Sequence, residues 1–263
     1  MIYARNLCEL YDAYNRREYV HPDPLEFLYD YKELRDREIV GLIASSLAYG
    51  AVRQILKSVG SVLGRMDSPY LFLRQSSKES LRETFKDFKH RFTTGDELST
   101  MLYGIKKTVE RYGSLQECFA QGFSSEQETV IPALSSFVDE LRSVFDGRPR
   151  SLLPSPDAGS ACKRLNLFLR WMVRRDQVDP GGWDNIPASS LIVPLDVHMH
   201  RISLQLGLTK RKQADLRAAC EITAAFRGIE PEDPVRYDFV LTRLGIRDDL
   251  DPEEFLKSCR SDD

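Results

Sequence analysis

The chain has 263 residues, 42% of them hydrophobic, and a formal net charge of −3, so it has enough apolar material for a sizeable folded core and is not typical of a disordered protein. No apolar run approaches the length of a membrane span, and the first residues lack the basic-then-apolar order of a signal peptide. We therefore expect a cytoplasmic protein, which would be nucleoid-associated if it binds DNA.

The predicted elements are almost all helices. Apolar residues recur at helical spacing between capping residues and glycines. The expected helices cover residues 36–50, 52–64, 68–75, 77–88, 95–113, 124–146, 160–175, 197–206, 210–227 and 234–244. The one strongly β-like run, residues 191–195, has five residues and leads directly into a helix cap. The sequence therefore predicts an all-α fold.

The charge is unevenly distributed along the chain. Residues 159–217 contain ten Lys or Arg against five Asp, a local charge of +5 that leaves −8 for the rest. A basic face on an acidic body is typical of a protein that contacts a phosphate backbone, and a solvated helix face remains the alternative.

The five cysteines, Cys8, Cys118, Cys162, Cys220 and Cys259, are far apart and form no C-x-x-C pair. This spacing gives no signal for a disulfide framework, a zinc site or an iron–sulfur cluster. We expect free thiols, no metal and no cofactor.

Lys163 lies in the first turn of the expected helix 160–175, "SACKRLNLFLRWMVRR". A helix start carries positive potential, so a lysine there is poorly placed for helix stability. One interpretation is an exposed lysine that the fold tolerates. The other is a nucleophile, because positive potential and partial burial favour the neutral amine that attacks carbon.

Asp196 stands in "LIVPLDVHMHRISLQLGL", between an apolar run and the expected helix 197–206. As an N-cap it would accept hydrogen bonds from free backbone N–H groups. A carboxylate fixed in this way stays ionised and can also stabilise positive charge that develops on a sugar ring. The two roles are compatible.

His198 and His200 lie two residues apart in the expected helix 197–206. On a helix such residues point roughly 200° apart, so they cannot share one metal ion unless the segment is extended. No third ligand stands at a useful spacing. The sequence therefore predicts no metal site here.

The phrase "VPLDVHMHRISLQLGL" resembles the V-D-T-H-V-x-R-V-x-x-R-L-G-L segment of the helix–hairpin–helix DNA glycosylases, the endonuclease III superfamily. In that family the aspartate is catalytic, which matches Asp196, and an upstream lysine opens a helix, which corresponds to Lys163 in "LLPSPDAGSACKRLN". A third segment, "VGLIASSLAYGAVRQIL", is similar to the family's early helix and its DNA-contacting turn.

The chain departs from endonuclease III in three respects. Pro154 to Ala158 stand where the family's hairpin has glycines, Lys163 and Asp196 are 33 residues apart with "DQVDPGGWDNIPASS" as the apparent insertion, and the cluster cysteines are absent. The first two departures are similar to the archaeal 8-oxoguanine glycosylase branch. The whole chain also resembles a bacterial family of that superfamily without an established activity, which shares "SACKRLNLFLRWMVR" and "PLDVH".

The resemblance implies a two-lobed helical unit over residues 1–263 with a degenerate hairpin. One lobe would cover about residues 36–160, and the other the N-terminal helices with about residues 197–263. It also implies a monomer that binds double-stranded DNA and uses Lys163 and Asp196 for base removal. The residues expected to contact DNA or the extruded base are Arg53, Gln54, Arg164, His198, Arg201, Tyr237 and Asp238.

The leading hypothesis is a DNA repair N-glycosylase with AP-lyase activity that removes a damaged base, with oxidised purines as the expected substrates. An alternative is a catalytically inactive nucleic-acid-binding protein on the same fold. A third is an all-α interaction protein whose basic face meets an acidic protein. Convergence of Lys163 and Asp196 on one cleft would separate the first hypothesis from the second.

Overall fold

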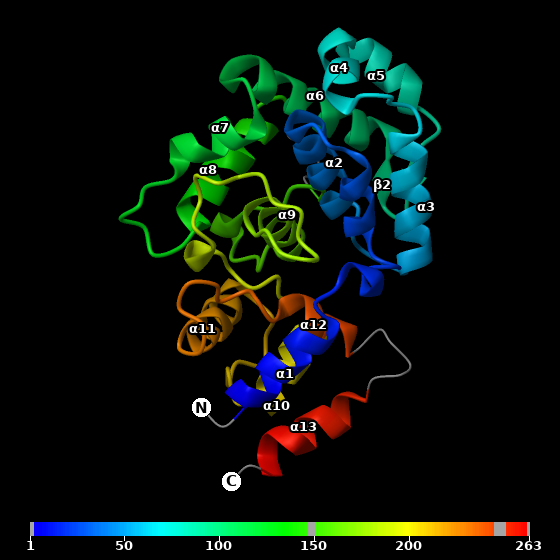
Figure 1. Ribbon diagram of the computed structural model, residues 1–263. Helices are drawn as coiled ribbons and strands as arrows, with labels where there is room; N and C mark the ends of the chain where they lie inside the picture. Colours follow the sequence, from blue (N-terminus) through cyan, green and yellow to red (C-terminus); the bar gives the residue numbers. More distant parts are fainter. Residues whose placement is uncertain (1–2, 147–150, 245–250, 262–263) are drawn as a thin grey trace.

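The computed structural model describes residues 3–146, 151–244 and 251–261, and within them it confirms the predicted all-α fold (Figure 1). The α-helices are α1 (Ala4–Tyr14), α2 (Leu34–Ser46), α3 (Val52–Leu63), α4 (Pro69–Gln75), α5 (Lys78–Phe85), α6 (Gly95–Tyr112), α7 (Leu115–Gly122), α8 (Ile131–Arg142), α9 (Lys163–Val173), α10 (Val197–Gln205), α11 (Leu216–Arg227), α12 (Asp238–Arg243) and α13 (Pro252–Ser261). The short 3-10 helices are η1 (Arg17–Tyr19), η2 (Pro24–Asp30), η3 (Pro156–Ala158) and η4 (Ala188–Ser190).

The sheet that the structure describes is a single small hairpin, in which β1 (Lys89–His90) pairs antiparallel with β2 (Thr93–Thr94). The sequence pattern did not predict it. Helices α7 and α13 were not predicted either, and α1 was expected only as one of the N-terminal helices, without bounds. No helix within the described residues combines the length and the apolar character that a membrane span requires.

Two predicted helices are shorter than expected because their caps lie elsewhere. Helix α11 begins at Leu216, since the Asp215 carboxylate accepts a hydrogen bond from the Ala218 N–H, 2.8 Å away. The helix expected at 234–244 is α12 and begins only at Asp238. Asp233 stands at the cap position of the expected helix, but its carboxylate accepts hydrogen bonds from the Arg174 guanidinium instead.

Helix α2 is the centre of one part of the molecule. Its residues 38–46 are all buried, so the helix is covered on every side rather than on one stripe. It packs against α9, and Gly41 makes the close approach possible: a Cβ there would lie 3.3 Å from the Phe168 ring and 3.4 Å from the Met172 sulfur. The position of α9 is therefore fixed by the core.

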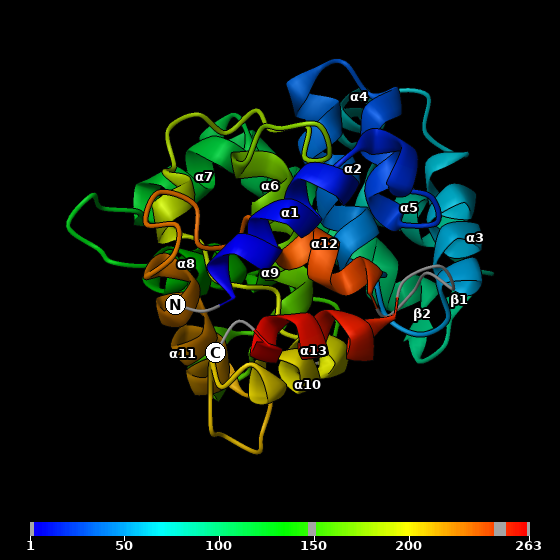
Figure 2. The same ribbon diagram turned by 60° about the horizontal axis from the view of Figure 1, so that its bottom comes forward.

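Figure 1 shows α2 to α8 on one side of α9, and α1 with α10 to α13 on the other. Figure 2 shows α1, α12 and α13 close together, and α1 contacts both of the others although they lie at opposite ends of the chain. The exact limits of the two lobes expected from the sequence stay a prediction.

The segment between α9 and α10 folds back along α9. The N–H groups of Gly181 and Trp183 donate to the carbonyls of Trp171 and Met172, and the Trp183 indole lies 5.1 Å from the Phe168 ring, centroid to centroid. Residues 191–195 are extended and buried, without a strand partner in the described chain. This apolar run therefore carries Asp196 to the start of α10.

Glu38 is a buried carboxylate that joins α2 to the start of α7. Its oxygens accept hydrogen bonds from the N–H groups of Leu115 and Gln116, at 2.9 and 3.1 Å, and from the Trp183 indole, at 3.3 Å. The residue is 1% exposed. Burial raises the pKa of Glu38 to about 7, although the two backbone hydrogen bonds lower it in part.

Because the pKa of Glu38 is raised in the folded protein, we expect the free energy of unfolding to depend on pH. A carboxyl whose pKa is higher in the folded than in the unfolded state contributes stability that is lost as the pH rises from about 4.5 to about 7. In Glu38→Gln, the slope of the unfolding free energy between pH 5 and 7 should become less negative by up to about 1.4 kcal/mol per pH unit. Urea unfolding at several pH values measures this slope.

The control for that measurement is Glu33→Gln, because Glu33 is exposed and lies one turn earlier on the same segment. Its slope should match that of the unchanged protein. An identical slope in Glu38→Gln and the unchanged protein would contradict the assignment of this titration to Glu38.

Candidate active site

Helix α9 begins at Lys163 after an unusual backbone conformation. The preceding residue, Cys162, has φ 46° and ψ 37°, in the left-handed region that residues with a side chain rarely adopt. The Asn166 amide stabilises this turn by donating to the Ala161 carbonyl, at 2.9 Å. Lys163 is thereby the first helical residue; the helix begins three residues later than the expected start at 160, and Lys163 lies in its first turn, as expected.

Asp196 caps α10, as expected. Its Oδ1 atom accepts a hydrogen bond from the Met199 N–H, at 2.9 Å, which satisfies one free donor of the helix start. The other oxygen, Oδ2, takes no part in this bond and lies 3.9 Å from the Lys163 Nζ atom. One carboxylate therefore caps the helix and faces the lysine at the same time.

The two side chains are accessible and only loosely engaged with each other. Lys163 and Asp196 are 30% and 28% exposed, and 3.9 Å is longer than a hydrogen bond. Lys163 Nζ makes no hydrogen bond to any residue that the structure describes. The amine therefore keeps its hydrogen-bonding capacity for a ligand in the cavity.

Both side chains line a cavity of about 710 Å³, within the range of small-molecule sites. One of its walls is a single stripe of α9, since Lys163, Leu167 and Arg170 follow one another at helical spacing. The remaining lining residues are Pro22, Asp23, Pro24, Ala48, Tyr49, Gly50, Val52, Ile55, Arg164, Pro194, Leu195, Asp196, Val197, His198, Ala214, Asp238, Phe239, Thr242 and Arg243.

Asp238 adds a second carboxylate to this cavity. It is 3% exposed, and its Oδ2 atom pairs with the Arg170 guanidinium. Burial raises the pKa of Asp238 to about 6; Arg170 opposes the increase, Asp196 adds to it and Lys163 reduces it. Lys163, Asp196 and Asp238 thus influence one another, and Asp23 is a third carboxylate in the cavity.

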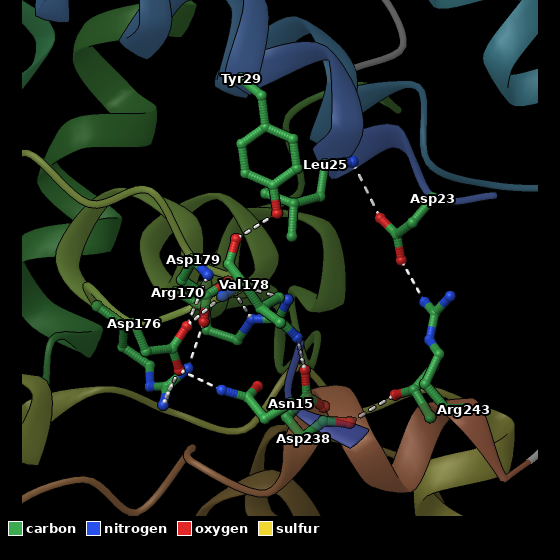
Figure 3. Close-up of polar contacts among 12 residues, drawn as sticks. Asn15, Asp23, Leu25, Tyr29, Arg170, Asp176, Val178, Asp179, Asp238 and Arg243 are labelled. Atoms are coloured by element: carbon green, nitrogen blue, oxygen red, sulfur yellow. Dashed lines mark hydrogen bonds and ion pairs between the residues drawn. The ribbon is translucent and has the colours of Figure 1, made fainter. Parts of the chain in front are cut away.

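Behind the cavity, Arg170 belongs to a buried polar network (Figure 3). Its guanidinium also pairs with the fully buried Asp179, at 3.2 Å, and Arg174 pairs with the same carboxylate. Asp176 accepts a further bond from Asn15 of the segment after α1. This network connects α9 to the segment between α9 and α10, to the segment after α1 and to α12.

Arg164 and His198, two of the predicted DNA-contacting residues, do line the cavity. Arg164, however, donates to the Ser46 and Ser151 carbonyls, and its guanidinium lies 5.0 Å from the Tyr49 ring centroid. It is therefore part of the cavity wall more than a free surface cation. His198 is exposed at the start of α10.

The structure separates the other predicted contact residues. Tyr237 is 1% exposed and its hydroxyl contacts the Cys8 sulfur, so it faces the core rather than the cavity. Arg53 and Gln54 are exposed on the first turn of α3, and Arg201 is exposed on α10; none of the three lines the cavity. Asp238 lines it, but as the partner of a buried arginine.

Fewer of the basic side chains in residues 159–217 lie on the surface than the charge of this segment suggested. Arg170 and Arg174 are 3% and 5% exposed and are occupied by aspartates. Two of the ten cations counted in residues 159–217 therefore stabilise the interior and cannot contact a phosphate backbone. The basic surface of this segment is therefore smaller than its count of Lys and Arg indicates.

The two histidines of α10 have different surroundings. The His200 Nε2 atom lies 2.9 Å from the Arg211 carbonyl oxygen in a buried position, whereas His198 is exposed. No group of three or more potential metal-ligating side chains occurs in the part of the chain that the structure describes.

In the turn before α9, three backbone N–H groups are hydrogen-bonded within the turn itself. The N–H groups of Asp157 and Cys162 donate to the Ser155 and Ser160 hydroxyls, and the Gly159 N–H donates to the Pro156 carbonyl. These groups are not directed outward as a backbone nest for a phosphate would be. The segment that was expected to form the degenerate hairpin therefore satisfies these N–H donors within its own turn.

Sequence reasoning missed the roles of Arg170, Tyr49 and Arg243 at the site. Arg170 could have been found from its spacing, because it lies seven residues after Lys163 on the same face of a helix. Arg243 pairs with Asp23, 220 residues away along the chain, and no local pattern announces such a contact.

Comparison with known families places the chain in one of them. Residues 23–247 match the family described as "Protein of unknown function (DUF2400)", and the chain belongs to this family. Neither a curated protein nor a solved structure matches the chain. The matched range includes every residue that lines the cavity except Pro22.

Proposed function

We propose that the protein is a DNA N-glycosylase with AP-lyase activity that removes a damaged base, with oxidised purines as the expected substrate class. The observation that supports the proposal most strongly is the position of Lys163 Nζ, 3.9 Å from the Asp196 carboxylate, at the edge of a cavity large enough for an extruded nucleoside. The resemblance of both surrounding segments to the helix–hairpin–helix glycosylases adds to it.

The chemistry begins with the neutral Lys163 amine. Its lone pair forms a bond to the sugar C1′ atom, the N-glycosidic bond breaks, and the electron pair leaves with the base, which takes up a proton. Positive charge develops on the sugar ring in the transition state. The free Asp196 oxygen is on the side of the lysine, where it offsets that charge.

The lyase step follows from the covalent intermediate. Opening of the sugar ring gives an iminium between Nζ and C1′, loss of a C2′ proton then expels the 3′-phosphate, and hydrolysis releases the lysine. Asp238 lies in the same cavity, where its ion pair with Arg170 holds its carboxylate in place.

The convergence of Lys163 and Asp196 favours this proposal over a catalytically inactive nucleic-acid-binding protein. An inactive descendant has no need to keep an amine without hydrogen bonds to the described residues beside a fixed carboxylate. The cavity equally gives a reason to prefer an enzyme over an interaction protein, which needs a surface and not a lined cavity.

The first test is borohydride trapping on duplexes that contain 8-oxoguanine, uracil or an abasic site. Borohydride reduces the iminium, so the unchanged protein should form a covalent adduct with DNA. In Lys163→Ala the adduct should disappear, whereas the exposed loop variant Lys212→Ala should retain it. Failure to form an adduct on all three duplexes, or an undiminished adduct in Lys163→Ala, would refute the lyase proposal.

The second test separates the cap role of Asp196 from its catalytic role. Asparagine is as good an N-cap as aspartate, so Asp196→Asn should leave stability within about 0.5 kcal/mol. Loss of the charge beside Lys163 should lower the single-turnover rate of base excision by roughly 10²- to 10³-fold. Both quantities are measured on the same protein preparation.

Asp215→Asn is the matched control, because Asp215 caps α11 by the same type of bond and does not line the cavity. Its excision rate should stay within about twofold of the unchanged protein. Equal rates for Asp196→Asn and Asp215→Asn would show that Asp196 acts only as a helix cap.

A further inference from the structure

Phe92 is the most exposed large apolar side chain among the described residues, with 79% of its surface accessible. It stands at the tip of the hairpin formed by β1 and β2. Because His90 pairs with Thr93, Arg91 and Phe92 form a two-residue turn, in which Arg91 has φ 52°. The aromatic ring is therefore presented on a tight turn.

The hairpin is firmly anchored. The Tyr49 hydroxyl bonds to the His90 carbonyl, at 2.9 Å, and to the Thr93 hydroxyl, at 2.6 Å. The buried His90 ring bonds in turn to the Ser58 hydroxyl of α3 and to the Tyr49 carbonyl. An exposed aromatic ring on such a support is held in place before any partner arrives.

The anchor is also a wall of the cavity. Tyr49 and Gly50 both line it, and the Arg91 side chain lies against Gly50: a Cβ at Gly50 would be 2.7 Å from the Arg91 Cδ atom. Gly50 has φ 97°, so this position suits glycine for both reasons. The hairpin tip therefore adjoins the rim of the cavity that contains Lys163.

Basic side chains lie on the same hairpin and on the helix beside it. The Arg91 guanidinium lies 5.5 Å from the Phe92 ring centroid, and Lys89 of β1 and Arg53 of α3 are exposed on two elements that contact each other. Figure 2 shows β1 and β2 beside α3. An apolar ring between basic side chains suits a partner with stacked apolar planes and an anionic edge, which duplex DNA provides.

We propose that Phe92 is the wedge that enters the base stack and occupies the space of the nucleotide extruded into the cavity. This inference rests on the proposed function and adds a positioning residue to it. Gln54, which was expected to contact DNA, is less suited to this role, because its amide donates to the Ser58 hydroxyl of its own helix, at 3.3 Å.

The test is the fluorescence of 2-aminopurine placed next to an abasic site in a duplex, with protein in saturating excess. Unstacking raises this fluorescence and requires no turnover. The unchanged protein and Phe92→Trp should raise it, whereas Phe92→Ala should give less than a third of that increase. Single-turnover excision from a lesion duplex by Phe92→Ala should fall at least tenfold, since unstacking is the step that it impairs.

Leu71→Ala is the control, because Leu71 is 50% exposed on α4 and does not line the cavity; it should behave as the unchanged protein. A full fluorescence increase with Phe92→Ala, or no increase with the unchanged protein, would overturn the wedge role. Borohydride trapping in the same samples reports on Lys163 independently of Phe92. A wedge that fails while trapping persists therefore leaves the proposed enzyme activity standing.

Discussion

The ion pair between Arg170 and Asp238 is the contact on which the site depends. It joins the face of α9 that carries Lys163 to the start of α12, and both residues are almost completely buried. A buried pair of this kind is expensive to break from one side, because the remaining charge has no solvent. The distance between α9 and α12, and with it the width of the cavity, is set by this pair and by its neighbour Asp179.

The same arrangement explains how one fold provides both a reactive amine and a fixed charge. Helices α9 and α10 both begin at the cavity, each with a side chain that its helix start influences: Lys163 on α9 and Asp196 at α10. The core fixes α9 through α2, and the buried run of residues 191–195 delivers Asp196. Lys163 is held by a core helix and Asp196 by a buried segment and a helix start, which suits a site that requires accurate geometry.

Much of the fold, and the positions of Lys163 and Asp196 at helix starts, could be predicted because the signals are local. Helical spacing reports which face of a segment is buried, and a cap such as Asp196 lies next to the helix that it serves. The limits of these signals are equally physical. Asp233 stands where a helix cap is expected but bonds to Arg174. Tyr237 was expected at the site from the resemblance but contacts Cys8. Both outcomes depend on segments distant along the chain. The hairpin that carries Phe92 was missed because each strand has two residues, too few to show an alternating pattern.

The most direct test of the account is the identity of the residue that becomes attached to DNA. After borohydride trapping on an abasic duplex, nuclease and protease digestion followed by mass spectrometry locates the reduced sugar on one peptide. The account predicts that the sugar is carried by Lys163, in the peptide that begins α9. A sugar on another lysine or on the N-terminal amine would contradict it.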